Sequence, residues 1–277
     1  AVPLAARREP WMDRLVSLVL PFVEPRTRLL IVKDFRTFRR DPQQWGQIVV
    51  FSGLMLLYFM NIRRFIEHLA GPYQNIISLL NLCAVALLLC TYTGRFVYPM
   101  LSLEGRKFWI LGLLPLQREQ LLWGKFAFSM TGGVLIAASL VLVSDLMLLM
   151  PALAILLHLV TVIVLAAGLS GLSVGLGACM PNFRESDPSK IAAGFGGTLN
   201  LVAGLLFLLV ILGLMAAPWH AQPILPETLR LPDEDLDFGE LLRPYTIVGM
   251  VLGLIAGSAC VVFPLRAGIR ALREMEF

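Results

Sequence analysis

ALAILLHLVTVIVLAAGLSGLSVGLGACM, residues 152–180, is a run of 29 residues without an Asp, Glu, Lys or Arg side chain. A helix of about 20 mostly apolar residues is long enough to cross the hydrocarbon core of a bilayer, which is about 30 Å thick. Similar stretches occur elsewhere, and the predicted spans are residues 47–61, 75–92, 125–149, 152–180, 188–216 and 245–265. The sequence therefore predicts an all-α polytopic membrane protein with six transmembrane helices, the first of them short.

The composition favours the same fold class. Hydrophobic residues make up 57% of the chain, charged residues make up 15%, and the mean hydropathy is +0.77. Soluble proteins average about 25% charged residues. The apolar runs are also mostly too long to be buried strands, which disfavours a soluble α/β protein.

The basic residues indicate an orientation. With the N-terminus in the cytoplasm, 19 Lys and Arg residues fall on the cytoplasmic side and 4 on the opposite side. Basic residues accumulate in cytoplasmic loops, so we predict an inner-membrane protein with both termini in the cytoplasm. They are spread over separate loops and do not gather with aromatic residues on one face, so no nucleic-acid partner is expected.

The N-terminal region is predicted to lie on the membrane surface. Within residues 26–41, apolar side chains recur at Leu29, Val32, Phe35 and Phe38, and basic residues fill other positions. A basic amphipathic helix of this kind lies among the lipid headgroups of the cytoplasmic leaflet. The alternative is a solvated helix that packs on another domain. The expected domains are a lead with this elbow helix at 1–43, a transmembrane domain at 44–271 and a cytoplasmic tail at 272–277.

The connection between the second and third predicted spans, residues 96–124, is too apolar for a loop surrounded by water. From residue 95 to 125 the sequence reads RFVYPMLSLEGRKFWILGLLPLQREQLLWGK. One side of it is expected to be covered by a partner or by the membrane interface. Pro115 breaks the segment, and a helix then restarts and leads into the third span.

This connection resembles the cytoplasmic loop of type-2 ABC exporter permeases. The resemblance is carried by EGRKFW at 104–109, LPL at 114–116 and LLWGK at 121–125. In that family the loop contains the coupling helix, and members have six spans, an elbow helix and cytoplasmic termini. MPNFRESDP at 180–188 is similar to a narrower group of ABC exporters that are often longer proteins. Because the chain also begins without Met, we expect a fragment or half of a longer permease.

The resemblance implies a transmembrane permease subunit of an ATP-driven exporter, which forms the substrate path. Its implied partners are an ABC-type ATPase subunit and a second permease half, as a homodimer or a heterodimer in the lipid bilayer. Ordinary loop chemistry is the alternative for each matching residue. The implied ATPase-coupling residues are Glu104, Gly105, Arg106, Lys107, Trp109, Pro115, Arg118 and Gly124.

The chain is predicted not to be an enzyme. It contains no G-x-x-x-x-G-K-[ST] run, the P-loop pattern that cradles nucleotide phosphates. An ATPase site is therefore expected on a separate subunit, and no cofactor is predicted. The four cysteines lie in or beside apolar spans without paired metal-ligand spacing, so no metal site is expected either.

Small residues within the spans are predicted to let helices approach closely, because lipid provides no hydrophobic drive for helix association. A hinge is the alternative role for these residues. The candidate packing glycines are Gly168, Gly171, Gly175, Gly194, Gly196 and Gly197.

Two intramembrane polar residues, Asp145 and His158, flank the predicted turn at Pro151. Such residues are costly in a membrane and are therefore candidates for function. A local hydrogen-bonded pair, or Asp145 reaching the outer interface, is the favoured interpretation. A substrate or proton site is the alternative.

Two other classes of function were weighed. Residues 168–171, GLSG, match the short serine motif of rhomboid proteases, but no histidine lies on the sixth span to serve as the base, which disfavours that enzyme. A non-transporting membrane scaffold or accessory subunit of a larger complex is the main alternative to the permease.

The connection between the fifth and sixth predicted spans, residues 218–244, is acidic. It carries six Asp and Glu residues and two Arg residues, which agrees with a location outside the cell. Its apolar residues suggest short helices that form either an exit gate or a folded cap.

Overall fold

The computed structural model describes residues 31–36, 46, 49–50, 52–59, 71–107, 118–222 and 238–274. Within these ranges the chain is helical apart from short turns and contains no strand, so the predicted all-α class is confirmed. This part of the chain has five helices that are long and apolar enough to cross a membrane, which is consistent with membrane association. They are Tyr73–Glu104, Glu119–Met147, Ala152–Cys179, Phe195–Gln222 and Arg243–Glu274.

Six spans and the elbow helix are not confirmed. The first predicted span and the predicted elbow are described only in part, with helical residues at 52–59 and 31–36. Residues 108–117 of the predicted coupling loop and residues 223–237 of the predicted external loop lie outside the described residues.

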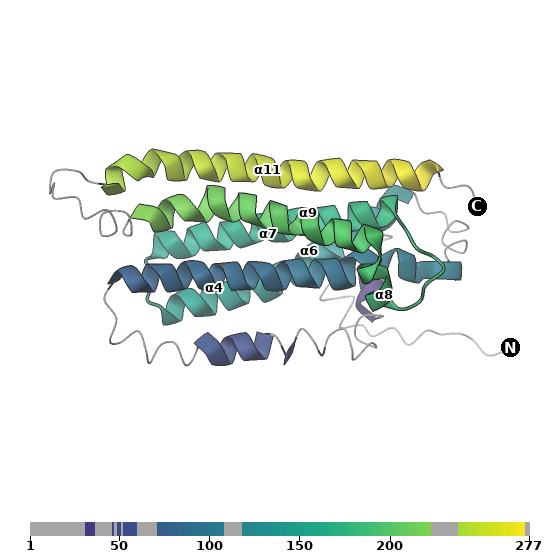
Figure 1. Cartoon of the computed structure of the whole chain (residues 1–277), viewed down its shortest axis with the longest axis horizontal. Helices are drawn as coiled ribbons and strands as arrows, with labels where there is room; N and C mark the ends of the chain where they lie inside the picture. Colours follow the sequence, from purple (N-terminus) through teal and green to yellow (C-terminus); the bar gives the residue numbers. More distant parts are fainter. Residues whose placement is uncertain are drawn as a thin grey trace.

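The long helices lie side by side and alternate in direction along the chain (Figure 1). The first and fourth of these five helices are longer than the α-helices α4 (Gly71–Tyr92) and α9 (Phe195–Ile211) within them, because helical turns of other types follow each α-helix without a break. The elements are α4 (Gly71–Tyr92), η1 (Thr93–Val97), η2 (Tyr98–Met100), η3 (Ser102–Lys107), α6 (Arg118–Met147), α7 (Ala152–Cys179), α8 (Pro188–Ala193), α9 (Phe195–Ile211), η4 (Leu212–Ala216) and α11 (Phe238–Glu274), with a further helical turn at 217–222.

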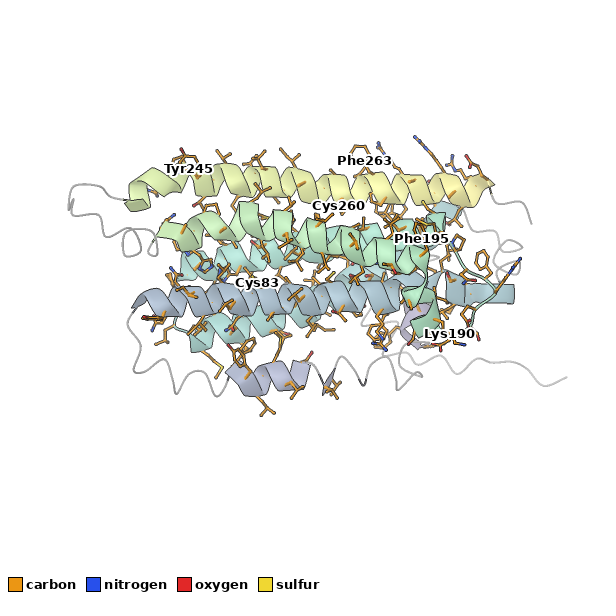
Figure 2. The ribbon with its side chains drawn as sticks, in the orientation of Figure 1. Cys83, Lys190, Phe195, Tyr245, Cys260 and Phe263 are labelled. Carbon is orange, nitrogen blue, oxygen red and sulfur yellow. The ribbon has the colours of Figure 1, made fainter. Side chains whose placement is uncertain are left out.

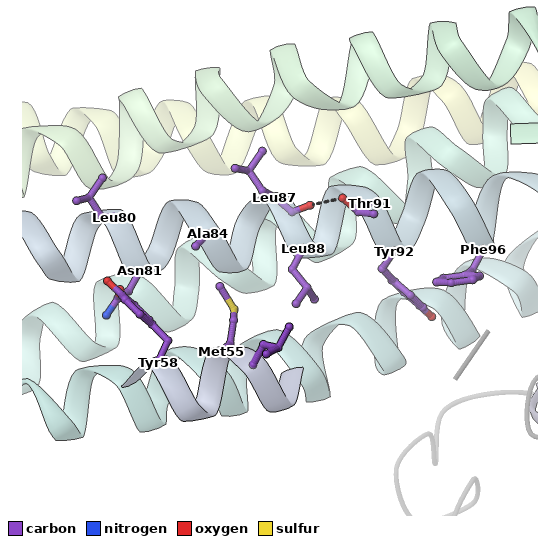
Figure 3. Close-up of a pocket in the computed structure, with 11 residues that line it drawn as sticks. Met55, Tyr58, Leu80, Asn81, Ala84, Leu87, Leu88, Thr91, Tyr92 and Phe96 are labelled. Carbon is purple, nitrogen blue, oxygen red and sulfur yellow. Dashed lines mark hydrogen bonds between the residues drawn. The ribbon is translucent and has the colours of Figure 1, made fainter. Parts of the chain in front are cut away.

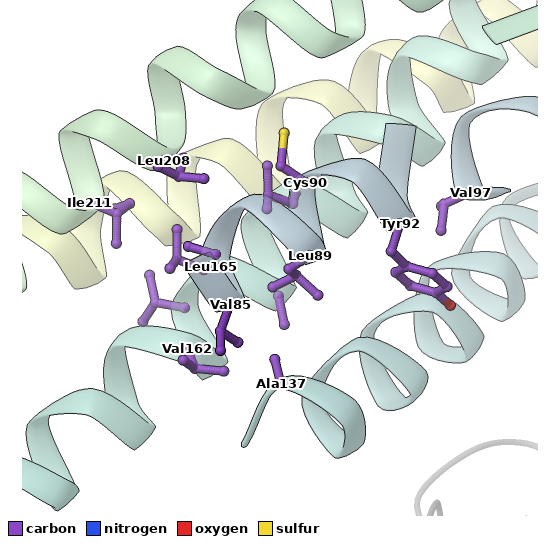
Figure 4. Packing of buried hydrophobic residues seen from close by; sticks show 14 of the residues in the cluster. Val85, Leu89, Cys90, Tyr92, Val97, Ala137, Val162, Leu165, Leu208 and Ile211 are labelled. Atoms are coloured by element: carbon purple, nitrogen blue, oxygen red, sulfur yellow. The ribbon is translucent and has the colours of Figure 1, made fainter. Parts of the chain in front are cut away.

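Helix α7 is the centre of the bundle and contacts α4, α6, α9 and α11. Figure 4 shows buried side chains of α7 and of three neighbouring helices packed together, among them Val85, Ala137, Leu165 and Ile211. All four side chains are fully buried. In contrast, Tyr245 and Phe263 project from the outer side of α11 (Figure 2) and are 61% and 71% exposed, as expected of a helix face that meets lipid.

The second span is longer than the predicted 75–92. Helical structure continues from Tyr92 through η1, η2 and η3 to Lys107. Val97, Tyr98 and Leu101 are 2–3% exposed, so their burial against the bundle holds the extension in place. Pro99 is tolerated because it stands in the first turn of η2, where its missing N–H is not needed.

A tight turn joins α6 to α7. Leu149 adopts a left-handed conformation (φ 54°), and the Met150 N–H donates to the carbonyl oxygen of Asp145 at 3.0 Å. This is the usual way in which a helix end satisfies its last carbonyl groups. The extended Pro151 then begins α7, so the last turn of α6 lies beside the first turns of α7.

The fifth predicted span, 188–216, is interrupted near its start. Asp187 caps α8 by accepting a hydrogen bond from the Ser189 N–H, and α8 ends at the extended Gly194, which also begins α9. A Cβ atom on Gly197 would lie 2.0 Å from the Ala192 carbonyl oxygen, so only glycine fits this corner. Sequence hydropathy does not detect the corner, because no charged side chain occurs from Ile191, near the end of α8, through the end of α9.

Candidate functional site

A chain of buried polar side chains crosses the end of the bundle where α4 and α7 begin, at the left in Figure 1. His158 Nδ1 lies 2.8 Å from Asp145 Oδ2, and His158 Nε2 lies 2.9 Å from His220 Nε2. His220 Nδ1 lies 3.1 Å from Asn75 Oδ1. The two imidazole rings are stacked, with an interplanar angle of 14°. We call Asn75, Asp145, His158 and His220 the polar relay.

Four segments supply the polar relay: α4, α6, α7 and the helical turn at 217–222. Asp145, His158 and His220 are each 1% exposed, whereas Asn75 is half-buried. Ser78 also donates a hydrogen bond to the second carboxylate oxygen of Asp145 at 3.1 Å. Every carboxylate and imidazole heteroatom of the polar relay thus has a partner, as a buried polar group requires.

The sequence drew attention to Asp145 and His158, and the structure brings these two side chains into contact. It did not single out His220 or Asn75. His220 lies in the stretch expected to be an external loop, and Asn75 stands at the edge of a predicted span. The available signal was that His220 is one of only three histidines in the chain.

A second polar group lies at the opposite end of the bundle. Lys125 Nζ is 2.9 Å from Glu104 Oε1 and 3.6 Å from Asp34 Oδ2. Lys33 also pairs with both carboxylates, and its nitrogen is 3.5 Å from Asp34 Oδ1. We call Lys33, Asp34, Glu104 and Lys125 the charge cluster. It contains two positive and two negative groups and is therefore neutral overall.

The charge cluster ties together three segments that are distant in sequence: the helical residues 31–36, η3 and the first turns of α6. Lys125 and Asp34 have side chains that are only 2% and 6% exposed, whereas Lys33 is 38% exposed. Removing one partner of a buried ion pair leaves an uncompensated charge and costs about 3–5 kcal/mol. The three segments are therefore held together strongly at this point.

The predicted coupling residues are described unequally. Glu104 belongs to the charge cluster, and Gly124 is buried in α6 beside Lys125. Gly105, Arg106 and Lys107 form the end of η3, and Arg118 begins α6. Trp109 and Pro115 lie outside the described residues.

Three of the predicted packing glycines line one side of α7. A Cβ atom on Gly171 would lie 2.7 Å from Val261 Cα, and one on Gly175 would lie 2.3 Å from the Pro264 carbonyl oxygen, both on α11. A Cβ atom on Gly168 would lie 2.2 Å from the ring of Phe207 on α9. These distances are far below van der Waals contact, so neighbouring helices approach α7 directly at these glycines.

The other three predicted packing glycines lie at the corner between α8 and α9. A Cβ atom on Gly196 would lie 2.1 Å from the Tyr98 hydroxyl oxygen. Gly194 and Gly197 contact the backbone of α8. These positions shape the corner and its contact with η2.

A cavity of about 460 Å³ opens between residues 54–58 and α4 (Figure 3). Met55 and Tyr58 face Leu88 and Asn81 across it. The Asn81 amide donates to Ser144 Oγ at 2.8 Å, so its N–H group is already engaged. The cavity therefore presents a mainly apolar surface. In the described ranges, no group of three or more His, Cys, Asp or Glu side chains is arranged to hold a metal ion.

The fold and the two buried polar groups define a helical protein whose described part has five helices long and apolar enough to cross a membrane. A family model described as "Putative ATP-binding cassette" matches residues 4–277, and the chain therefore belongs to this family. No curated protein and no solved structure matches the chain.

The family match corrects three predictions. The chain is matched as an ATP-binding cassette, so its identification as a permease of the type-2 ABC transporter family is contradicted, together with the function of a permease subunit. The alternative of a scaffold or accessory subunit does not fit this family either. An ATP-binding cassette would carry an ATPase site, which contradicts the prediction that the chain is not an enzyme.

The permease prediction depended mainly on two short connections, and this narrow basis is the reason for the error. The resemblance was carried by residues 104–125 and 180–188, whereas the family match extends over nearly the whole chain. The sequence still contains no P-loop run, and the described ranges contain no strand that could lead into one. The described helices therefore do not form a P-loop.

Proposed function

We propose that this chain is a membrane-embedded ATP-binding-cassette protein that works in an ABC transport system of the inner membrane. The family match and the five membrane-length helices support this proposal. The excess of Lys and Arg supports an orientation in which the charge cluster and both termini face the cytoplasm. An ABC-type ATPase subunit and a second membrane half, either another copy or a different chain, are the proposed partners.

The charge cluster is the feature that supports the proposal of an ATPase partner. Its Glu104 directly precedes residues 105–117 in the sequence and pairs with Lys125 of α6 and with Lys33 of residues 31–36. A displacement of the segment must move Glu104. Because breaking the buried Glu104–Lys125 pair would cost several kcal/mol, α6 would follow.

The proposed contact with the ATPase is therefore this segment. The residues assigned to it are those predicted from the sequence, from Glu104 through Trp109 and Pro115 to Gly124. In this proposal Glu104 transmits the movement, and Trp109 buries its ring against the partner.

Photocrosslinking tests the proposal. The full chain is expressed in its native membrane with benzoylphenylalanine at position 109, irradiated and purified. We expect an ATPase subunit to be crosslinked. The matched control carries the same group at position 245, which is 61% exposed on α11 at the opposite end of the bundle. No crosslinked ATPase from position 109, or an equal amount from position 245, would overturn the proposal.

A second measurement tests the role of Glu104. Glu104→Gln keeps the size of the side chain but weakens its pairing with Lys125. We expect the ATPase to copurify with this variant and ATP hydrolysis by the purified assembly to fall. Lys190→Met, which changes a side chain that is 68% exposed in a loose pair with Glu185, serves as the control. Equal hydrolysis by both variants would refute transmission through Glu104.

A further inference from the structure

The number of ring protons in the polar relay depends on which way the Asn75 amide faces. Asp145 Oδ2 and Asn75 Oδ1 are acceptors, so each requires a proton on the Nδ1 atom that faces it, on His158 and His220 respectively. The two Nε2 atoms face each other at 2.9 Å, and one of them must donate. With the Asn75 oxygen facing His220, three ring protons are needed, whereas two neutral imidazoles carry only two.

We propose that the polar relay is a binding site for one exchangeable proton, which His158 and His220 share and for which Asp145 is the counter-ion. With this proton bound, one ring is an imidazolium and Asp145 is a carboxylate, so the relay is neutral. A buried charge is tolerated inside the bundle when it belongs to a neutral ion pair in which every lone pair and N–H group has a partner.

Release of the proton has a defined structural consequence. The relay then carries one net negative charge and two ring protons. His158 keeps its Nδ1 proton for Asp145, and the remaining proton lies on His220 Nε2, where it donates to His158. His220 Nδ1 becomes an acceptor, so the Asn75 side chain must turn and offer its amide N–H in place of its oxygen.

Asn75 is thus both the switch and the point of access. It is the one half-buried member of the relay, whereas the other three are 1% exposed. Asn75 also lies near the start of α4, at the end of the bundle. A proton that leaves His220 therefore passes to water on the Asn75 side.

The described side chain that donates to the relay from outside it carries no charge. Helix α4 contributes Asn75 and Ser78, which are neutral. Gln222, two residues after His220, donates a hydrogen bond to Thr246 of α11 at 3.3 Å, and both of these side chains are also neutral. Bound proton and counter-ion therefore both belong to the relay, and the site joins four segments of the bundle. This inference does not depend on the ATPase partner proposed above.

Nitrogen-15 NMR of histidine-labelled full chain in lipid nanodiscs tests the proton count directly. The chain has three histidines, and His68→Gln removes the one outside the described residues. We titrate from about pH 5 to about pH 9, the range in which histidine ordinarily titrates. At acid pH we expect both Nδ1 atoms to be protonated and one of the two rings to be an imidazolium. As the pH rises, we expect the pair to lose a single proton. His220 should then be a neutral ring that is protonated at Nε2 only.

Two results would overturn the proposal. One is that both rings stay neutral throughout the titration. The other is that the proton is lost while His220 keeps its Nδ1 proton, since Asn75 would then not be the switch. The titration of the chain with both relay histidines intact needs no change within the relay, so it decides the question even if relay variants fail to fold.

A pair of variants isolates Asn75. Asn75→Asp offers only acceptor oxygens and adds a negative charge, so the deprotonated arrangement cannot form. We expect proton loss to move to higher pH by about one unit or more. Gln74→Glu adds the same charge on the neighbouring residue of α4 and should move the transition much less. Equal shifts in the two variants would overturn the switch.

Discussion

Gly175→Ala is expected to destabilise the contact between α7 and α11. A Cβ atom on Gly175 would lie 2.3 Å from the carbonyl oxygen of Pro264, 2.4 Å from its carbonyl carbon and 2.6 Å from its Cβ atom. These are mostly backbone atoms of a helix, so no flexible side chain can move aside. The two helices must separate by about 1 Å to reach ordinary van der Waals contact at about 3.4 Å.

The magnitude follows from this separation. A gap of about 0.5–1 Å forfeits about a quarter to a half of the dispersion energy of each atom pair across the contact. Overpacking of this kind typically costs about 1–3 kcal/mol. Ala favours a helix over Gly by about 1 kcal/mol, which offsets part of the loss. We therefore expect a net destabilisation of about 1 kcal/mol.

Gly213→Ala is the matched control. Gly213 lies in η4, and nothing stands within 4 Å of its Cβ position, so the same methyl group meets open space. We expect this variant to unfold at or slightly above the midpoint of the unsubstituted protein.

The assay is reversible unfolding of the full chain in mixed micelles with increasing dodecyl sulfate, followed by tryptophan fluorescence. Gly175→Ala should unfold at a clearly lower denaturant fraction than Gly213→Ala. Coincident curves for the two variants would refute the close approach of α7 and α11 on which the reasoning depends.

The same assay measures three further effects. Lys125→Met leaves two carboxylates without their buried counter-charge and should cost about 3 kcal/mol of stability. Lys190→Met changes an exposed side chain and should change stability by less than about 0.5 kcal/mol. Equal costs for the two variants would contradict the burial of Lys125. Asn200→Leu removes a buried carbonyl oxygen that has no hydrogen-bond partner, so stability should rise by about 1 kcal/mol, and a loss would show a hidden partner. Ser129→Ala removes the 2.7 Å hydroxyl contact with Ser170 between α6 and α7 and should cost about 0.6 kcal/mol; an unchanged midpoint would mean that the contact adds nothing.

The long apolar helices were predictable, and their ends were less so. Residues 152–180 predicted α7 to within one residue, because the run is bounded by Pro151 and Pro181 and holds no charge. The second span was predicted to end at residue 92, yet its helical structure reaches Lys107. Arg95 and Pro99 suggested a loop there, and only the burial of Val97 and Leu101 keeps the segment helical.

The candidate sites were predictable only one residue at a time. Asp145 and His158 stood out because polar groups are rare in apolar spans, and the short turn between α6 and α7 made their contact plausible. His220 is 62 residues from His158, and Asn75 is 145 residues from His220. No local pattern links such distant positions, so their contact follows from the packing of four segments.

Function was the least predictable property. The motif at residues 104–125 indicated a permease, and the family match over residues 4–277 contradicted it. A short loop motif constrains few residues, whereas a match along the chain depends on many positions at once. The motif therefore described one surface and did not identify the whole protein.

The sequence by itself determined that this chain is helical and rich in membrane-length apolar segments, because hydropathy and the length of each run are local properties. Only the tertiary structure decided that Asp145, His158, His220 and Asn75 form one relay, and that Lys125 is buried between two carboxylates. The physical reason is that burial and hydrogen bonding depend on which helices pack together. That packing is set by close approaches such as Gly175 against Pro264, between positions 89 residues apart in the chain.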